Sequence, residues 1–155
     1  MKHYMFSYGM NTNLIGMKSR CPKAKRIDVA VLDQHRLDFR LHADVIDDED
    51  NVVHGLLWQL SDDDLDIMDI VEGYPRYYIR ELLPVTTEDG RVYNAWVYKM
   101  NDQYAHRLPD GYYWDMVLEG YIENGIDHNQ LYMALGRSAE YEHYYQDISE
   151  LGHPR

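Results

Sequence analysis

The chain has 155 residues, of which 45% are hydrophobic, so it can bury one core and fits a single domain over residues 1–155 better than two. Its formal net charge of −12 argues against nucleic acid and anionic lipid as partners, because a negative surface repels phosphate groups. Cys21 is the only cysteine, which excludes an intrachain disulfide and a thiolate metal cluster.

The sequence carries no signal for a membrane. No stretch approaches the roughly 18 apolar residues that a membrane helix needs. The first apolar run reaches Gly9 too soon to be a signal peptide. We therefore expect a cytoplasmic protein without membrane contact.

The N-terminal residues predict a strand, a tight loop and a helix. An aromatic and apolar run over residues 3–8 ends at Gly9, and turn-forming residues follow it before an apolar stretch over 14–17. Backbone N–H groups in the loop Tyr8-Gly9-Met10-Asn11 can bind an anion such as a ligand carboxylate. An ordinary glycine turn with Asn11 as a cap fits the same residues, so the loop alone leaves both interpretations open.

The next segment is rich in residues that favour strands. Extended runs over residues 27–32 and 36–41 flank Asp33-Gln34-His35 and predict a hairpin or a strand pair. The acidic residues 47–51 are predicted to form a loop, and residues 52–60 a strand in which Gly55 marks a bulge or a close backbone approach. The acidic run lacks the spacing of a calcium loop, and the eight scattered histidines show no metal-binding pattern, so we predict no metal site.

A helix is predicted from Ser61 to about Glu72. Ser61 can cap it, and the aspartates that follow complement the positive end of the helix dipole. A glycine and a proline end it. Residues 77–87 and 91–100 then predict a long β-hairpin.

The position of Glu72 on this helix is unusual for a carboxylate. A rotation of about 100° per residue places it between Leu65 and Met68, whereas Asp66 and Asp69 point to the solvent side. Burial would raise its pKa and make it a proton carrier at neutral pH. Alternatively, Glu72 frays into solvent at the helix end, and its position does not decide between the two.

The C-terminal part predicts two helices, at about residues 112–124 and 128–148, the second following a core of residues 3–126. A tyrosine stripe over residues 141–145 fits either packing onto the domain or a homodimer contact, so we expect a monomer or a homodimer. Strands joined by hairpins, with helices inserted between them, indicate an α+β fold with a small mixed, barrel-like sheet.

Several short motifs occur in one order along residues 4–100. They are Tyr8-Gly9-Met10-Asn11, Arg20-Cys21-Pro22-Lys23-Ala24, Leu37-Asp38-Phe39, Gly55-Leu56-Leu57-Trp58, Asp69 through Pro75, Tyr78 and Ala95-Trp96-Val97-Tyr98. A weaker match continues over residues 109–113. This ordered set resembles the γ-glutamylcyclotransferase family, also called AIG2-like.

The resemblance implies a barrel-like fold and a reaction without cofactor on a small-molecule γ-glutamyl amine or γ-glutamyl amino acid. The α-amine attacks the γ-carbonyl of the same molecule, which gives 5-oxoproline and a free amine. By resemblance, Glu72 is the general acid/base. The implied substrate-binding residues are Tyr8, Gly9, Met10, Asn11, Tyr78 and Tyr113.

Two alternatives accompany this interpretation. The loop backbone from Gly9 to Asn11 can hold either the substrate α-carboxylate or the developing oxyanion. The family commonly has serine where this chain has Met10, and a thioether there favours a less polar leaving group such as an alkylamine. The rival function is a binding module that holds a γ-glutamyl or small-carboxylate metabolite without turnover, although retention of Glu72 favours catalysis.

Overall fold

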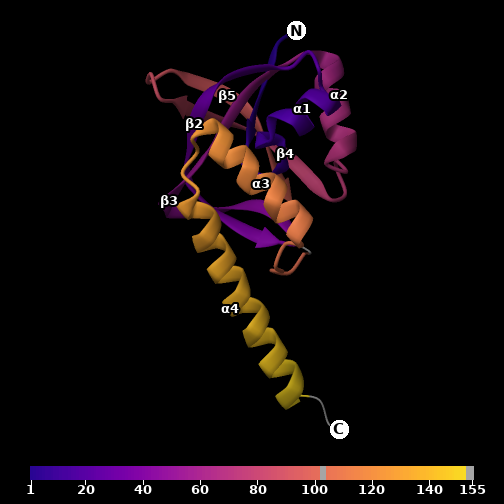
Figure 1. The fold of residues 1–155 in the computed structure, drawn as a ribbon, viewed down its shortest axis with the longest axis vertical. Helices are drawn as coiled ribbons and strands as arrows, with labels where there is room; N and C mark the ends of the chain where they lie inside the picture. The colour runs from indigo at the N-terminus through magenta and orange to yellow at the C-terminus, as the bar shows by residue number, and fades with distance from the viewer. Residues whose placement is uncertain (102–103, 153–155) are drawn as a thin grey trace.

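The computed structural model describes residues 1–101 and 104–152, with side chains as far as Glu140 and that of His143. Five strands close into a barrel in the order β1-β3-β2-β4-β5 (Figure 1). Their bounds are β1 His3–Ser7, β2 Lys25–Arg40, β3 His42–Leu60, β4 Tyr78–Thr87 and β5 Val92–Met100. Neighbouring strands are antiparallel except β1 and β5, whose parallel contact at Met5 and Trp96 closes the barrel. The predicted α+β, barrel-like fold is therefore confirmed.

The helices are inserted between the strands or follow them. They are the 3-10 turn η1 Met10–Thr12, α1 Leu14–Arg20, α2 Asp62–Val71, α3 Gly111–Asn124 and α4 Asn129–Gly152. Helix α3 lies across one face of the barrel, and α4 extends away from it toward the C-terminus (Figure 1). The side chains of the tyrosine stripe over 141–145 lie outside the described residues. No helix in the described ranges has the length and apolar character to cross a membrane.

The prediction of a hairpin around Gln34 is wrong. Residues 25–40 form one strand, and Gln34, at φ 59°, marks an irregularity at which the register with β3 shifts. The chain reverses instead at Leu41, at φ 71°. The acidic residues 47–51 lie within β3 and not in a loop, although residues 48–51 have no register partner on β2. A bulge absorbs these extra residues, which local turn propensity does not distinguish from a loop.

Apolar side chains from all five strands fill the barrel. Phe6, Leu56 and Leu57 are among the fully buried ones. The backbone at Gly55 approaches β1 so closely that a Cβ atom there would lie 2.4 Å from the carbonyl oxygen of Ser7. This confirms the predicted close approach and explains why a glycine stands in the middle of the strand.

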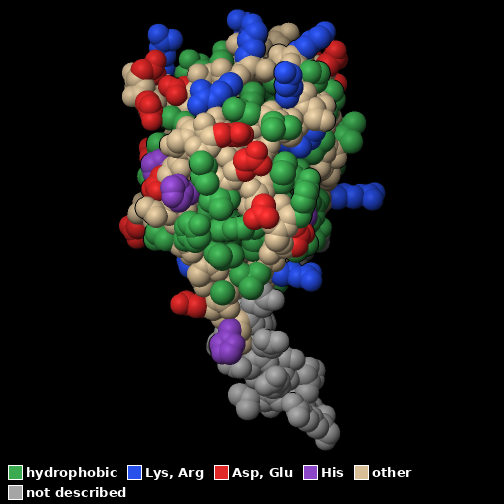
Figure 2. Space-filling view, in the orientation of Figure 1, with side chains coloured by type: hydrophobic (Ala, Val, Ile, Leu, Met, Phe, Trp, Pro, Cys, Tyr) green, Lys and Arg blue, Asp and Glu red, His purple; other side chains and the backbone are tan. Residues whose placement is uncertain are grey.

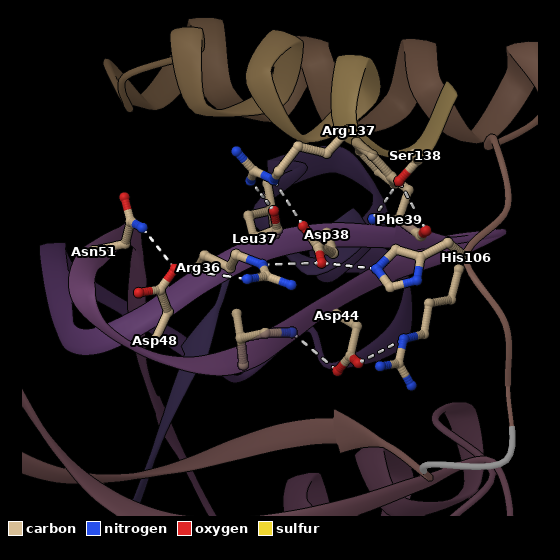
Figure 3. A network of polar contacts seen from close by, with 12 residues as sticks. Arg36, Leu37, Asp38, Phe39, Asp44, Asp48, Asn51, His106, Arg137 and Ser138 are labelled. Atoms are coloured by element: carbon tan, nitrogen blue, oxygen red, sulfur yellow. Dashed lines mark hydrogen bonds and ion pairs between the residues drawn. The ribbon is translucent and has the colours of Figure 1, made fainter. Parts of the chain in front are cut away.

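A buried carboxylate attaches α4 to β2 (Figure 3). Asp38 is 1% exposed, and its oxygens lie 3.0 Å from Arg137 Nε and 2.8 Å from His106 Nε2. Arg36 Nε donates to the same carboxylate at 3.2 Å. Burial acts to raise the pKa of Asp38, but the bonds from His106, Arg137 and Arg36 outweigh it and hold this pKa below its usual value. The carboxylate thus stays ionised and joins strand, helix and the segment before α3.

The net negative charge is not spread evenly over the surface. Lys and Arg side chains gather at the end of the molecule that carries the N-terminus (Figure 2). Helix α1, with Lys18 and Arg20 in its last turn, lies toward that end (Figure 1). On the face shown in Figure 2 the basic side chains are therefore concentrated at one end of a molecule whose overall charge is −12.

Helix α3 packs against the loop that follows β1. Asn124 Nδ2 donates to the carbonyl of Thr12 at 2.8 Å. A Cβ atom at Gly120 would lie 2.3 Å from Thr12 Oγ1 and 2.7 Å from the backbone nitrogen of Asn13. The absence of a side chain at Gly120 therefore permits the contact that holds this loop.

We expect Gly120→Ala to destabilise the fold by about 2 kcal/mol or more, because the helix must move away from the loop backbone. Gly136→Ala on α4 is the matched control, since a Cβ atom there meets nothing within 4 Å. It should be neutral or stabilise by up to about 1 kcal/mol. Urea unfolding measures both, and equal effects of the two substitutions would contradict the packing argument.

Candidate active site

A cavity of about 150 Å³ lies where the loop after β1 and the end of α2 meet β3, β4, β5 and α3. All seven residues predicted from the sequence line it, namely Tyr8, Gly9, Met10, Asn11, Glu72, Tyr78 and Tyr113. The other lining residues are Met5, Phe6, Ser7, His42, Ala43, Val71, Tyr77 and Tyr98. Phe and Tyr make up six of the fifteen lining residues, and Glu72 is the one carboxylate among them.

Hydrogen bonds fix the loop between β1 and α1. The backbone nitrogen and the hydroxyl of Thr12 donate to the carbonyl of Gly9 at 3.1 and 2.7 Å. Trp58 Nε1 donates to the carbonyl of Asn11 at 3.0 Å. Within the described part of the chain, the N–H groups of Gly9 and Asn11 have no acceptor, so both can donate to a ligand.

Glu72 is the C-cap residue of α2, with a helical backbone, and does not fray. Its N–H donates to the carbonyl of Met68 at 2.9 Å, and both Leu65 and Met68 are buried on the same side of α2. Its carboxylate reaches the cavity, where Asn11 Nδ2 donates to Oε1 at 2.7 Å. The helical rotation therefore predicted the direction of this side chain correctly.

The surroundings of Glu72 favour its neutral form. Burial raises the pKa of Glu72 from 4.5 to about 7, while the Asn11 hydrogen bond and the charge of Arg20 act against this rise. No basic side chain of the described residues forms an ion pair with it. A carboxyl group with a pKa near 7 can accept and return a proton at neutral pH.

Two tyrosines meet at the backbone of Ala43. Tyr78 Oη donates to the carbonyl of Ala43 at 2.7 Å, and the N–H of Ala43 donates to Tyr113 Oη at 2.9 Å. A phenol oxygen that accepts one N–H group still has its own proton to donate. Gly9 permits this arrangement, because a Cβ atom there would lie 3.0 Å from Tyr113 Oη.

Tyr8 forms part of the wall of the cavity, and its hydroxyl is already hydrogen-bonded within the protein. Its side chain is 5% exposed, and its hydroxyl donates to the carbonyl of Tyr98. Burial, and next the charge of Asp44, raise the pKa of Tyr8 well above its usual value. The phenol is therefore neutral at any physiological pH and joins β1 to β5.

Sequence reasoning missed His42 and Asp44. His42 lines the cavity, with Nδ1 2.6 Å from Tyr77 Oη, and burial lowers its pKa. Asp44 is 3% exposed and accepts the N–H of Met100 at 2.8 Å. Burial raises its pKa to about 6. Both residues flank Ala43, the attachment point of two tyrosines, and no local pattern marks them because their partners are distant in sequence.

The prediction that Asp69 points to solvent is wrong. Its carboxylate accepts a hydrogen bond from Tyr98 Oη at 2.6 Å and two from Arg80, at 2.9 and 3.2 Å. At about 100° per residue Asp69 lies next to Leu65 around the helix, so the prediction misread the rotation, and the rotation alone does not show which strands flank the helix. Here β5 supplies the phenol and β4 the guanidinium. Asp66, also predicted to face solvent, is exposed.

Arg20 belongs to the surroundings of the site although it does not line the cavity. Its Nη2 lies 3.5 Å from the carbonyl of Met10, and its charge lowers the pKa of Glu72. No sequence pattern marks Arg20 as a site residue, because its motif is a helix end beside Cys21. Cys21 itself is buried, with Sγ 3.8 Å from the carbonyl of Asp64.

Comparison with known proteins identifies one family. The family described as Gamma-glutamyl cyclotransferase, AIG2-like, matches residues 5–116, which is more than half of the chain and includes every predicted site residue. No curated protein matches the chain.

Solved structures share the fold at low sequence identity. One titled "Gamma-glutamyl cyclotransferase" superimposes with a TM-score of 0.76 at 22% identity, over 92% of this chain and 87% of its own. An uncharacterized protein from Homo sapiens gives a TM-score of 0.75 at 23% identity, over 91% and 86% of the two chains. YkqA from Bacillus subtilis gives 0.68 at 20%, over 79% of this chain and 49% of its own. These similarities establish the fold alone.

The raised pKa of Glu72 predicts a pH-dependent stability. Because this pKa is about 7 in the folded protein against an ordinary value of 4.5, the folded state loses stability as pH rises from about 4.5 to about 7. Gln remains neutral and can still accept from Asn11. We therefore expect Glu72→Gln to match the wild type near pH 4.5 and to exceed it by up to about 3 kcal/mol at pH 8.

Urea unfolding at the two pH values tests this expectation. Glu119→Gln, on an exposed position of α3, is the matched control and should change the stability equally at both values. A Glu72→Gln difference that does not grow with pH would show that Glu72 is not buried as described.

Proposed function

Because this chain belongs to the γ-glutamyl cyclotransferase, AIG2-like family, we propose that it converts a γ-glutamyl amine or γ-glutamyl amino acid to 5-oxoproline and a free amine. The observation that carries this proposal is the carboxyl group of Glu72, held by Asn11 in an aromatic cavity with a pKa of about 7. Such a group suits a reaction that moves one proton twice.

In the proposed reaction the α-amine of the substrate attacks its own γ-carbonyl carbon. Glu72 takes a proton from the attacking nitrogen, and the carbonyl oxygen becomes an oxyanion. When the oxyanion collapses, the bond between the γ-carbon and the leaving nitrogen breaks, and Glu72 returns the proton to that nitrogen. The carboxylate is regenerated, so each turnover needs only one substrate molecule.

Binding the substrate in a conformation that brings its α-amine to its γ-carbonyl provides much of the rate enhancement. Well-oriented intramolecular reactions reach effective molarities of about 10⁵ M or more, so the cavity must mainly fix the chain conformation. In our proposal the N–H groups of Gly9 and Asn11 bind the α-carboxylate. The hydroxyl of Tyr113, whose oxygen already accepts the N–H of Ala43, donates to the γ-carbonyl oxygen as charge develops there.

The composition of the cavity supports a leaving group of low polarity. Met10 supplies a thioether where the family commonly has a serine hydroxyl, and Val71 and Tyr77 extend the apolar wall. An α-carboxylate on the leaving group would need a cation or a second set of N–H donors, and the one basic side chain among the lining residues is His42, whose pKa is lowered by burial. We therefore propose that γ-glutamyl alkylamines are better substrates than γ-glutamyl amino acids.

The test is to incubate the protein with a panel of γ-glutamyl amino acids and γ-glutamyl alkylamines and to measure 5-oxoproline. We expect turnover by the wild type, and a loss of about 10³-fold or more in kcat for Glu72→Gln, which removes the proton carrier. For the wild type, kcat/KM should rise with pH through about 7 as Glu72 ionises.

Glu119→Gln should keep wild-type activity, because the exposed carboxylate on α3 is remote from the cavity lining. If no member of the panel yields 5-oxoproline while calorimetry still detects binding, the proposed reaction is wrong and the chain is a binding module for γ-glutamyl or small-carboxylate metabolites. Equal activity of Glu72→Gln and the wild type would instead remove Glu72 from the reaction.

A further inference from the structure

Asp69 lies one helical turn before Glu72 on α2, and its carboxylate is bound entirely by groups from other elements. Tyr98 Oη, from β5, donates to Oδ1 at 2.6 Å. Arg80, from β4, donates through Nε to Oδ1 at 2.9 Å and through Nη2 to Oδ2 at 3.2 Å. The side chains of Asp69 and Arg80 are 19% and 18% exposed, so solvent screens this contact only in part.

The two partners of Asp69, Tyr98 and Arg80, also contact residues that lie around Glu72. Tyr98 lines the cavity, and its carbonyl accepts a hydrogen bond from the hydroxyl of Tyr8, the first residue of the loop after β1. Arg80 lies over the ring of Tyr74, with its guanidinium carbon 5.0 Å from the ring centre. The N–H of Tyr74 in turn donates to the carbonyl of Asp69 at 2.9 Å. The backbone before and after Glu72 is thus held by one group of contacts, formed by Asp69, Arg80 and Tyr98.

The end of α2 needs such an anchor. Helix ends fray, and the negative end of the helix dipole disfavours acidic side chains. Asp69 and Glu72 both lie at this end, and the last turn of α2 contains no basic residue. Arg80 supplies the missing positive charge from a strand. Its guanidinium also lies 4.2 Å from the ring centre of Trp96, which fixes its direction.

We propose that Asp69 is a positioning residue for Glu72: through Tyr98 and Arg80 it fixes the last turn of α2, so that the carboxyl group of Glu72 faces Asn11 and the cavity. This inference deepens the proposed function and rests on it. Asp69 itself does not line the cavity and makes no contact with the substrate.

The test compares Tyr98→Phe and Asp69→Asn with the wild type. Tyr98→Phe keeps the aromatic wall, the carbonyl that binds Tyr8 and every charge, and removes only the hydroxyl that reaches Asp69. Asp69→Asn keeps the size of the side chain but loses its charge. Asp66→Asn, the same change three residues earlier on an exposed position of α2, is the matched control.

Two measurements are made on each variant: kcat and KM for the best γ-glutamyl substrate, and the pKa of Glu72 from an NMR titration of ¹³C-labelled glutamate, assigned with Glu72→Gln. The titratable or charged groups that face Glu72 are Arg20 and tyrosines 8, 77, 78, 98 and 113. Tyr98→Phe alters no charge at neutral pH, so a shift in that variant reports position.

We expect kcat to fall by about tenfold or more in Tyr98→Phe and Asp69→Asn, with KM within about threefold, because a small misplacement of an acid/base group slows the reaction strongly. The pKa of Glu72 should fall toward 4.5 as its carboxyl group leaves the cavity. Asp66→Asn should change neither quantity.

Wild-type kcat and an unchanged Glu72 titration in Tyr98→Phe and Asp69→Asn would overturn the proposal. So would a loss of kcat with an unchanged titration, because Glu72 would then still be in place. Should the wild type turn over no substrate, the proposed function fails, and the titration alone still decides whether Asp69 positions Glu72.

Discussion

The arrangement of this molecule depends on one partly buried carboxyl group with a neutral hydrogen-bond partner. Glu72 accepts a hydrogen bond from the amide of Asn11, and desolvation exceeds the stabilisation that this bond gives to the ionised form. A cation in direct contact would restore the ordinary pKa and remove the group as a proton carrier at neutral pH. The structure must therefore keep its arginines away from Glu72 while it holds the helix end in place.

Two arginines around this helix end meet the requirement in different ways. Arg80 is bound to Asp69, one turn earlier, and stabilises the acidic end of α2 without touching Glu72. Arg20 lies behind the loop and reaches the carbonyl of Met10, where its charge only moderates the pKa of Glu72. Because electrostatic interactions weaken with distance, a charge that makes no direct contact with Glu72 changes its pKa less than an ion pair would.

The fold brings these groups together from distant parts of the chain. The loop after β1 is held by Trp58 from β3 and by Asn124 from α3, so its N–H groups have fixed positions before any ligand binds. Tyr113 and Tyr78 meet at Ala43, at the start of β3. Preorganised donors of this kind lower the cost of stabilising charge that develops during a reaction.

The sequence by itself determined the elements with strong local signals and the side of α2 that Glu72 occupies. Ser61, with Asp64, forms the capping box that starts this helix, and the period of Leu65 and Met68 fixes its buried face. Tertiary structure alone decided that Gln34 lies within one strand, because strand pairing overrides local turn propensity. Tertiary structure alone also decided that Asp69 is hydrogen-bonded and not solvated. Its partners Tyr98 and Arg80 lie on β5 and β4, and the periodicity of a helix does not show which strands pack beside it.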